Sequence, residues 1–241
     1  MNDSDMKLLC IEACTSRLSL ALFVGGKPLA KSYPQKDARH HCEALIPAVD
    51  ELLKDAGVSV KDLSAIAVTR GPGSFTSVRI ALATALGLAR VDNLPTYALS
   101  TLEVLAAGVM DKGLPVLALL DARKGEVYGG MYSFKDNHPE KLLEERVDKV
   151  ETVLQDALEC CSGQKIIVLG EGALAYKDKI SSDNFVFVED SSLNLPDASV
   201  LGRLALLKLD LKMKFDPATP NYLRQPEAVV NLGKVPKGLT E

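Results

Sequence analysis

The chain begins with short apolar segments in which hydrophobic residues alternate with smaller or polar ones. In RLSLALFV, Leu18, Leu20 and Leu22 recur at every second position, which predicts a half-buried strand. The apolar segment KLLCIEAC precedes it, and Gly25 and Gly26 indicate a hairpin that leads into KPLAKSYP. The pattern therefore predicts three successive antiparallel strands at the start of the protein.

The spacing of apolar residues then changes to that of helices separated by single strands. It predicts a helix from about 38 to 56, ended by Gly57, and a second helix from 75 to 90. Between them lie the strand SAIAVT and a Gly-Pro-Gly turn, and the strand LPTYAL follows. Ser100 and Glu103 have the spacing of a capping box, which predicts one more helix.

The second half of the chain repeats this order. LPVLALLD and EVYGGMYSF predict a strand pair around the turn ARKG, KIIVLGEG and NFVFVED predict later strands, and Asp197 is expected to cap a helix that runs to about 212. The sequence therefore predicts an α/β protein with two duplicated mixed-sheet lobes, 1–105 and 106–241, the second less regular. We expect the proline-rich end, FDPATPNYLRQPEAVVNLGKVPKGLTE, to fray.

The composition of the chain excludes several classes of protein. With 28 basic and 32 acidic residues in 241, the net charge of −4 lacks the positive surplus of a protein that binds nucleic acid alone. The start, MNDSDMKLLCIEAC, does not have the pattern of a secretory signal, and no apolar run reaches the about 18 residues of a membrane helix. The five cysteines form no C-x-x-C pair. We therefore expect a cytoplasmic protein with reduced thiols and no membrane contact.

Four motifs occur in a fixed order: GPGSFTSVRIALATALGLA, YALSTLEVLA, DARKGEVYGGMY and PNYLR. In these motifs, and most densely from residue 38 to 132, the chain resembles the bacterial TsaB family. The resemblance implies the two-lobed actin/Hsp70/sugar-kinase (ASKHA) fold. It also implies an inactive relative of TsaD, the catalytic protein with which TsaB makes threonylcarbamoyladenosine in tRNA.

The function implied by the resemblance is that of a non-catalytic scaffold subunit, which supports a TsaD-like subunit in modifying position 37 of tRNAs that read ANN codons. The implied partners are TsaD, a TsaE-like ATPase, a second copy of the chain when TsaD is absent, and tRNA only through the complex. No cofactor is expected on the isolated chain, whereas ATP and magnesium would act in the complex. The alternative is an autonomous ATP-dependent phosphotransferase of the same fold.

No metal site is expected. TsaD-like proteins hold a metal through two histidines one helical turn apart, which places both imidazoles on one helix face. Here His40 and His41 are adjacent, and side chains of adjacent helical residues point about 100° apart. The residues four positions further on are Ala44 and Leu45, so neither histidine has a ligand partner one turn away.

A candidate vestigial nucleotide site comprises Glu12, Gly71, Gly73, Ser74 and Asp121. By the resemblance, Glu12 matches the position where the family usually has an Asp, the carboxylate that positions magnesium in ATP-using members of this fold class, and Asp121 matches the corresponding acid of the second lobe. A glycine loop before a helix N-terminus can hold phosphate, but this loop lacks both the P-loop ending and the third glycine of the dinucleotide motif. The other interpretations are a helix cap for Ser74 and a tight turn for Asp121. GPGSF also lacks the G-x-S-x-G spacing, so no catalytic residue is predicted.

The helix from 75 to 90 has no charged face. Its large apolar residues Phe75, Val78, Leu82 and Leu86 fall within an arc of about 80°, which we expect to rest on the sheet. The remaining surface is small or apolar, and the helix from 38 to 56 is apolar over roughly 200°. Either the two helices pack on each other, or another chain covers them, as the resemblance implies for TsaD or a second copy. The candidate interface residues are Leu45, Val49, Leu52, Ile80, Ala83, Thr84 and Gly87.

Overall fold

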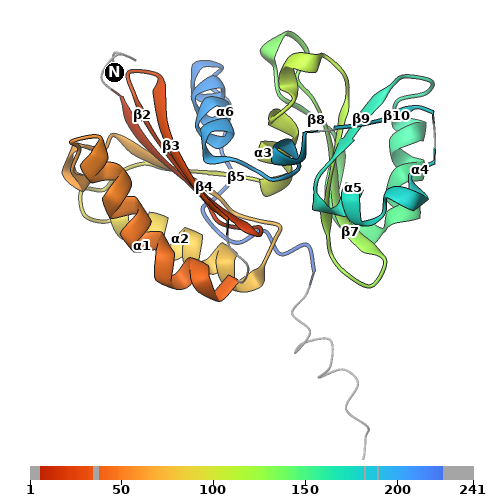
Figure 1. The fold of residues 1–241 in the computed structure, drawn as a ribbon. Coiled ribbons are helices and arrows are strands. Elements are labelled where there is room, and N and C mark those ends of the chain that lie inside the picture. Colours follow the sequence, from red (N-terminus) through yellow and green to blue (C-terminus); the bar gives the residue numbers. More distant parts are fainter. Residues whose placement is uncertain (1–5, 35–37, 182, 189, 225–241) are drawn as a thin grey trace, which may run out of the picture.

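The computed structural model describes residues 6–34, 38–181, 183–188 and 190–224, which form two five-stranded sheets with helices on both faces (Figure 1). The first sheet has the order β3-β2-β1-β4-β5. Its first three strands pair antiparallel, and β4 and β5 continue parallel to β1. The strands are β1 (Lys7–Glu12), β2 (Arg17–Val24), β3 (Lys27–Pro34), β4 (Ala65–Thr69) and β5 (Thr96–Leu99).

The second sheet repeats the topology of the first. Its order is β10-β9-β6-β7-β8, in which β6, β7 and β8 are antiparallel and β9 and β10 run parallel to β6. The strands are β6 (Val116–Asp121), β7 (Glu126–Ser133), β8 (Glu140–Lys149), β9 (Ile166–Leu169) and β10 (Phe185–Phe187). The prediction of two duplicated α/β lobes is therefore confirmed.

The helices lie outside and between the sheets (Figure 1). The outer face of the first sheet carries α1 (Ala38–Asp55) and α2 (Phe75–Ala89), and that of the second carries α4 (Val150–Cys160) and α5 (Glu171–Ala175). Between the sheets lie α3 (Thr101–Ala107) and α6 (Ala198–Asp210). The 3-10 turns are η2 (Val60–Asp62), η3 (Met110–Lys112), η4 (Lys135–Asn137), η5 (Lys177–Lys179) and η6 (Ser191–Asn194). Within these described residues no helix is long and apolar enough to cross a membrane.

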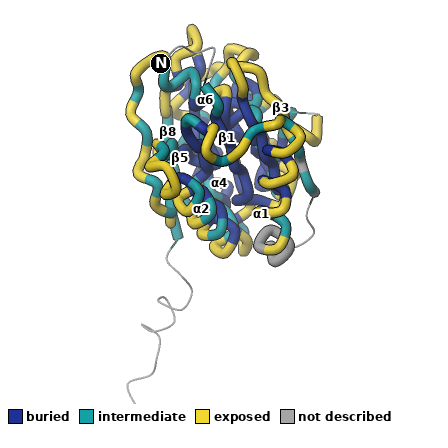
Figure 2. The backbone as a smooth tube through the Cα atoms, turned by 90° about the vertical axis from the view of Figure 1, so that its left-hand side faces the viewer, coloured by how far each residue is buried: buried dark blue, intermediate teal, exposed yellow. Residues whose placement is uncertain are grey.

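The two lobes share a hydrophobic core. Phe23 of β2, Tyr132 of β7 and Leu204 of α6 are all buried in the cluster that fills the space between the sheets. Figure 2 shows the buried strands in the interior, with exposed residues on the outer turns and helices. Because both sheets contribute to one core, the lobes are joined by apolar packing as well as by the chain.

Helix α6 belongs to the first lobe, although it lies in the second half of the sequence. It packs against β1 and β2, and Gly202 brings its backbone so close to Phe23 that an added Cβ would lie 2.1 Å from the ring. The assignment of all of 106–241 to the second lobe is therefore wrong for this helix. Asp197 caps α6 as predicted, because its carboxylate accepts a hydrogen bond from the Ser199 amide.

The predicted capping box at α3 forms only in part. Ser100 accepts a hydrogen bond from the Leu102 amide at 3.1 Å, as an N-cap should. Glu103, however, pairs with Lys208 of α6 instead of reaching back to the cap. A tertiary ion pair has replaced the local contact.

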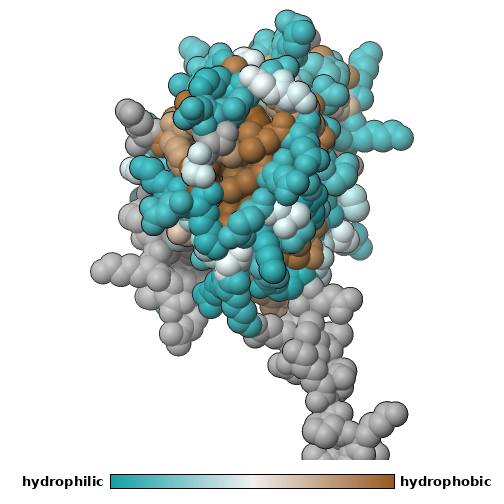
Figure 3. All heavy atoms as spheres, turned by 90° about the vertical axis from the view of Figure 1, so that its right-hand side faces the viewer, coloured by the Kyte–Doolittle hydropathy of each residue, from teal (hydrophilic) through white to brown (hydrophobic). Residues whose placement is uncertain are grey.

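The helices leave part of the second sheet's outer face uncovered. A groove at this face is lined by Leu117, Gly129, Leu143 and Val153. Figure 3 shows an apolar hollow on this side of the molecule, ringed by hydrophilic side chains.

Candidate partner interface and the closed glycine loop

The Gly-Pro-Gly loop between β4 and α2 is packed against the end of β1. Gly71 and Pro72 are buried, and Gly71 has a φ of +96°, which favours glycine. The Ser74 amide donates to the Cys14 carbonyl at 2.9 Å, and a Cβ on Gly73 would lie 2.2 Å from the same oxygen. The Ser74 amide, which could otherwise bind an anion at the start of α2, therefore makes a hydrogen bond within the protein.

Ser74 occupies the N-cap position of α2, but within the described residues its side chain makes no capping hydrogen bond. The predicted position is confirmed, and the predicted bond is wrong. The backbone contact with Cys14 holds the residue in place instead.

Glu12 is fully buried at the end of β1. Its Oε1 accepts a hydrogen bond from the Cys14 amide at 2.8 Å, while Oε2 has no partner among the described residues. Burial raises the pKa of this carboxyl to about 7, against the smaller opposing effects of hydrogen bonds and of Arg17. In this conformation the carboxylate cannot reach a water-bound magnesium ion, because it has no accessible surface.

Asp121 lies at the exposed end of β6 and organises the turn that follows. Its Oδ1 accepts hydrogen bonds from the Arg123 amide at 2.7 Å and from the Tyr176 hydroxyl at 3.0 Å. The turn interpretation therefore accounts for these contacts. The two carboxylates of the candidate nucleotide site therefore lie in different surroundings. Glu12 is buried in the first lobe, and Asp121 is exposed in the second.

The described residues contain no group of three or more His, Cys, Asp or Glu side chains placed to hold a metal. The backbones of His40 and His41 lie in α1, but their side chains are outside the described part of the chain.

Three of the predicted interface residues are in the protein's own core. Leu45, Val49 and Leu52 of α1 are buried against the first sheet, where α1 also packs beside α2. Their assignment to a partner contact is therefore wrong, because a second chain cannot reach these side chains. The mutual packing of the two helices accounts for this part of their apolar surface.

Helix α2 faces the sheet mainly with small side chains. Ala81 and Ala85 are fully buried, and Val78 and Leu82 are buried with them. The prediction that Phe75 and Leu86 also rest on the sheet is wrong, since these side chains are 41% and 44% exposed. Burial along α2 therefore does not follow side-chain size.

The exposed side of the helix pair carries an apolar surface, which we call the α2 face. On α2 it contains Phe75, Arg79, Ala83, Leu86 and Gly87, which fall within an arc of about 120°. Ile46 of α1 adds a side chain that is 54% exposed. Of the predicted interface residues, Ala83 and Gly87 therefore lie on this face, and Ile80 and Thr84 are half-buried at its edge.

The C-terminal segment lies against the start of α2. Tyr222 stacks on Phe75 with ring centroids 5.1 Å apart, and Arg79 Nε donates to the Tyr222 hydroxyl at 2.7 Å. The expectation of a frayed end is wrong for residues 216–224, while residues 225–241 lie outside the described part of the chain. The signal in the sequence was PNYLR, whose Tyr222 makes these contacts.

Comparison with known proteins assigns the family. A family model described as TsaD, tRNA N6-adenosine threonylcarbamoyltransferase, matches residues 32–232. The tRNA threonylcarbamoyladenosine biosynthesis protein TsaB of Escherichia coli K12 is 33% identical over 226 residues, which cover 91% of this chain and 95% of that protein. The chain belongs to the TsaB family.

Further similarities extend over nearly the whole chain. TsaB of Bacillus subtilis is 32% identical over 92% of this chain and 96% of its own length. The structure of YeaZ from Pseudomonas aeruginosa matches with a TM-score of 0.77 at 32% identity, covering 90% of this chain and all of that one. The chain therefore has the two-lobed ASKHA-type architecture that the motifs implied.

Proposed function

We propose that this TsaB-family chain is a non-catalytic scaffold subunit in the formation of threonylcarbamoyladenosine at position 37 of tRNAs that read ANN codons. Its partner in this role is a TsaD-like catalytic subunit. The relatives are named for biosynthesis of this nucleoside, and the matching family model is named for the transferase. These names indicate the pathway, and the surface of the chain supports the role that we propose within that pathway.

The α2 face carries the proposal. An isolated surface helix normally turns charged residues to water, whereas Ala83, Leu86 and Gly87 present an apolar surface there. An exposed apolar patch of this kind marks a protein contact. The TsaD family model covers all of α1 and α2, so a TsaD-like chain should have an equivalent helix pair. Two related folds can associate through equivalent faces, as identical subunits do about a two-fold axis.

The interior of the chain argues against the rival function, an autonomous ATP-dependent phosphotransferase. The Ser74 amide is occupied by Cys14, and Glu12 has no accessible surface. Kinase-like catalysis also requires lobes that close around substrates, and a shared hydrophobic core opposes such motion. We therefore propose that ATP and magnesium act in the complex, which also contains a TsaE-like ATPase. The complex forms in the cytoplasm. Because the chain has a net charge of −4, we propose that tRNA binds only through the complex.

Two measurements test this function. The chain should co-purify with a TsaD homologue, and its deletion should abolish threonylcarbamoyladenosine in cellular tRNA. Calorimetry of the isolated chain with magnesium-ATP should give no tight binding. Tight binding together with turnover of a small hydroxyl substrate would establish the phosphotransferase instead.

A further inference from the structure

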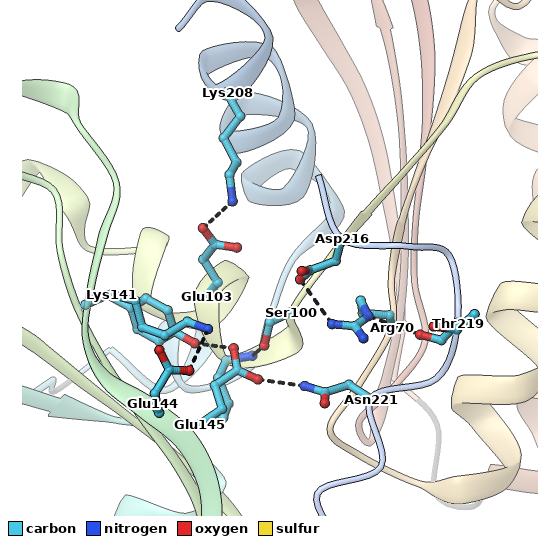
Figure 4. A network of polar contacts seen from close by, with 12 residues as sticks. Arg70, Ser100, Glu103, Lys141, Glu144, Glu145, Lys208, Asp216, Thr219 and Asn221 are labelled. Carbon is cyan, nitrogen blue, oxygen red and sulfur yellow. Dashed lines mark hydrogen bonds and ion pairs between the residues drawn. The ribbon is translucent and has the colours of Figure 1, made fainter. Parts of the chain in front are cut away.

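The segment from Asp216 to Arg224 connects the two lobes at the edge of the α2 face. On the first lobe, the Asn221 amide donates to the Arg70 carbonyl at 2.7 Å, and Arg70 pairs with Asp216 at 3.0 Å. Arg70 Nε also donates to the Thr219 carbonyl. Figure 4 shows this part of the segment lying along the first lobe beside Arg70. The backbone is thereby fixed just before Tyr222.

The same segment is held by the second lobe. Asn221 Nδ2 donates to Glu145 Oε2 at 2.7 Å, and the other oxygen of that carboxylate accepts from the Tyr132 hydroxyl at 2.6 Å (Figure 4). Arg224 donates to the Ala122 carbonyl at 2.7 Å and pairs with Glu126. The side chains on both sides of Tyr222 therefore reach the second lobe, while Tyr222 itself lies on the first.

We propose that Tyr222, held by this segment, forms with Phe75 and Arg79 an anchor site for the TsaD-like partner, so that partner affinity depends on contacts with the second lobe. This inference rests on the proposed function and adds the C-terminal segment to the α2 face. It assigns a binding role to a part of the sequence outside the α1–α2 helix pair.

The chemistry of the three side chains favours a protein partner. Tyrosine and arginine are enriched among the residues that dominate binding energy, and Tyr222 and Phe75 remain exposed although they stack. The Arg79 guanidinium lies 3.7 Å from the centre of the Phe75 ring, so the group is ordered before any partner arrives. Such order lowers the entropy that binding must remove.

The charge of Arg79 indicates which type of side chain the partner places at this site. Among the residues that the structure describes, Arg79 has no carboxylate partner, since its contacts are the two aromatic rings and the Tyr222 hydroxyl. A guanidinium stacked on an aromatic ring retains donors for a carboxylate. The site therefore fits an apolar helix face of a TsaD-like chain flanked by an acidic side chain.

The test compares variants of the full chain for binding to a TsaD homologue by calorimetry. Tyr222→Ala should weaken binding at least tenfold, whereas Tyr222→Phe, which keeps the ring, should stay within threefold. Arg224→Met should weaken binding several-fold, because the segment that holds Tyr222 keeps only the Asn221–Glu145 contact with the second lobe. Leu174→Ala on α5, an exposed apolar residue away from this site, is the matched control and should bind like wild type.

Melting temperatures and amide exchange separate the outcomes. Each variant should melt close to wild type, and exchange at 216–224 in the wild-type chain should slow on adding the homologue. If Tyr222→Ala destabilises the fold, Arg79→Gln replaces it, with the same loss expected. Wild-type affinity in the folded variants, or loss of self-association alone, would overturn the inference while leaving the proposed function intact. Failure of the wild-type chain to bind the homologue would instead overturn the proposed function.

Discussion

Lys208 of α6 and Glu103 of α3 form an ion pair at 2.6 Å with side chains only 11% and 13% exposed. The pair joins the two helices that lie between the sheets, one from each half of the sequence. Removing one partner of such a pair leaves a charge largely excluded from water.

Glu103→Ala should therefore destabilise the protein by on the order of 3 kcal/mol, and the double variant Glu103→Leu with Lys208→Met should recover much of the loss. Denaturant unfolding measures both. Asp50→Ala is the control, because its pair with Lys54 is exposed on α1 and should contribute less than about 0.5 kcal/mol. Equal losses for Glu103→Ala and Asp50→Ala would contradict this prediction.

Burial of Glu12 should make stability depend on pH. Its pKa is about 7 in the folded protein, against an ordinary 4.5, so the folded state binds the proton more tightly. The contribution to stability is then fully present below about pH 4.5 and is lost as the pH rises through about 7. Glu12→Gln cannot ionise and should exceed wild type in stability at pH 8 by up to about 3 kcal/mol.

Unfolding curves of wild type and Glu12→Gln at pH 5 and pH 8 measure this effect. At pH 5 the two proteins should differ by less than about 1 kcal/mol, because this pH is only just above the unfolded-state pKa and most of the contribution is still present. A stability difference that stays constant between the two pH values would show that Glu12 is not the group responsible.

Two helical glycines should respond in opposite directions to alanine. At Gly202 an added Cβ would meet the ring of buried Phe23, so Gly202→Ala should cost about 1–3 kcal/mol. At Gly87 no atom lies within 4 Å, and alanine should stabilise the exposed helix by up to about 1 kcal/mol. Thermal unfolding of the two variants compares them directly, and a tolerant Gly202 would mean that α6 can move away from Phe23.

A charge at the centre of the α2 face should affect binding and leave folding unchanged. Ala83 is exposed, so Ala83→Glu should melt within a few degrees of wild type. Burying that carboxylate in a partner contact should lower affinity for a TsaD homologue at least a hundredfold. Ala175→Glu is the control, because Ala175 is an exposed residue of α5. Binding by Ala83→Glu that matches this control would remove the α2 face from the contact.

The sequence by itself determined most of the elements and their order, although it gave no signal that predicted β8, α4 or α5. Alternation in RLSLALFV located β2, glycines marked the turns, and Asp197 set the start of α6, because strand period, turn conformation and helix capping are all local properties. The prediction that β2 is only half-buried is wrong, because helices and the second lobe cover both faces of this strand. The repeated order of elements in the two halves was sufficient to predict duplicated lobes. The motifs were sufficient to indicate the family.

Only the tertiary structure decided which faces meet. On α2, Ala81 and Ala85 are buried together with Val78 and Leu82, whereas Phe75 and Leu86 are exposed, because the face that a helix buries depends on what packs against it and not on side-chain size alone. Helix α6 crosses to the first lobe, and Tyr222 stacks on Phe75, through contacts between residues more than a hundred positions apart. The period of the sequence fixes the angle of a side chain around its own helix or strand, and packing alone fixes what that side chain meets.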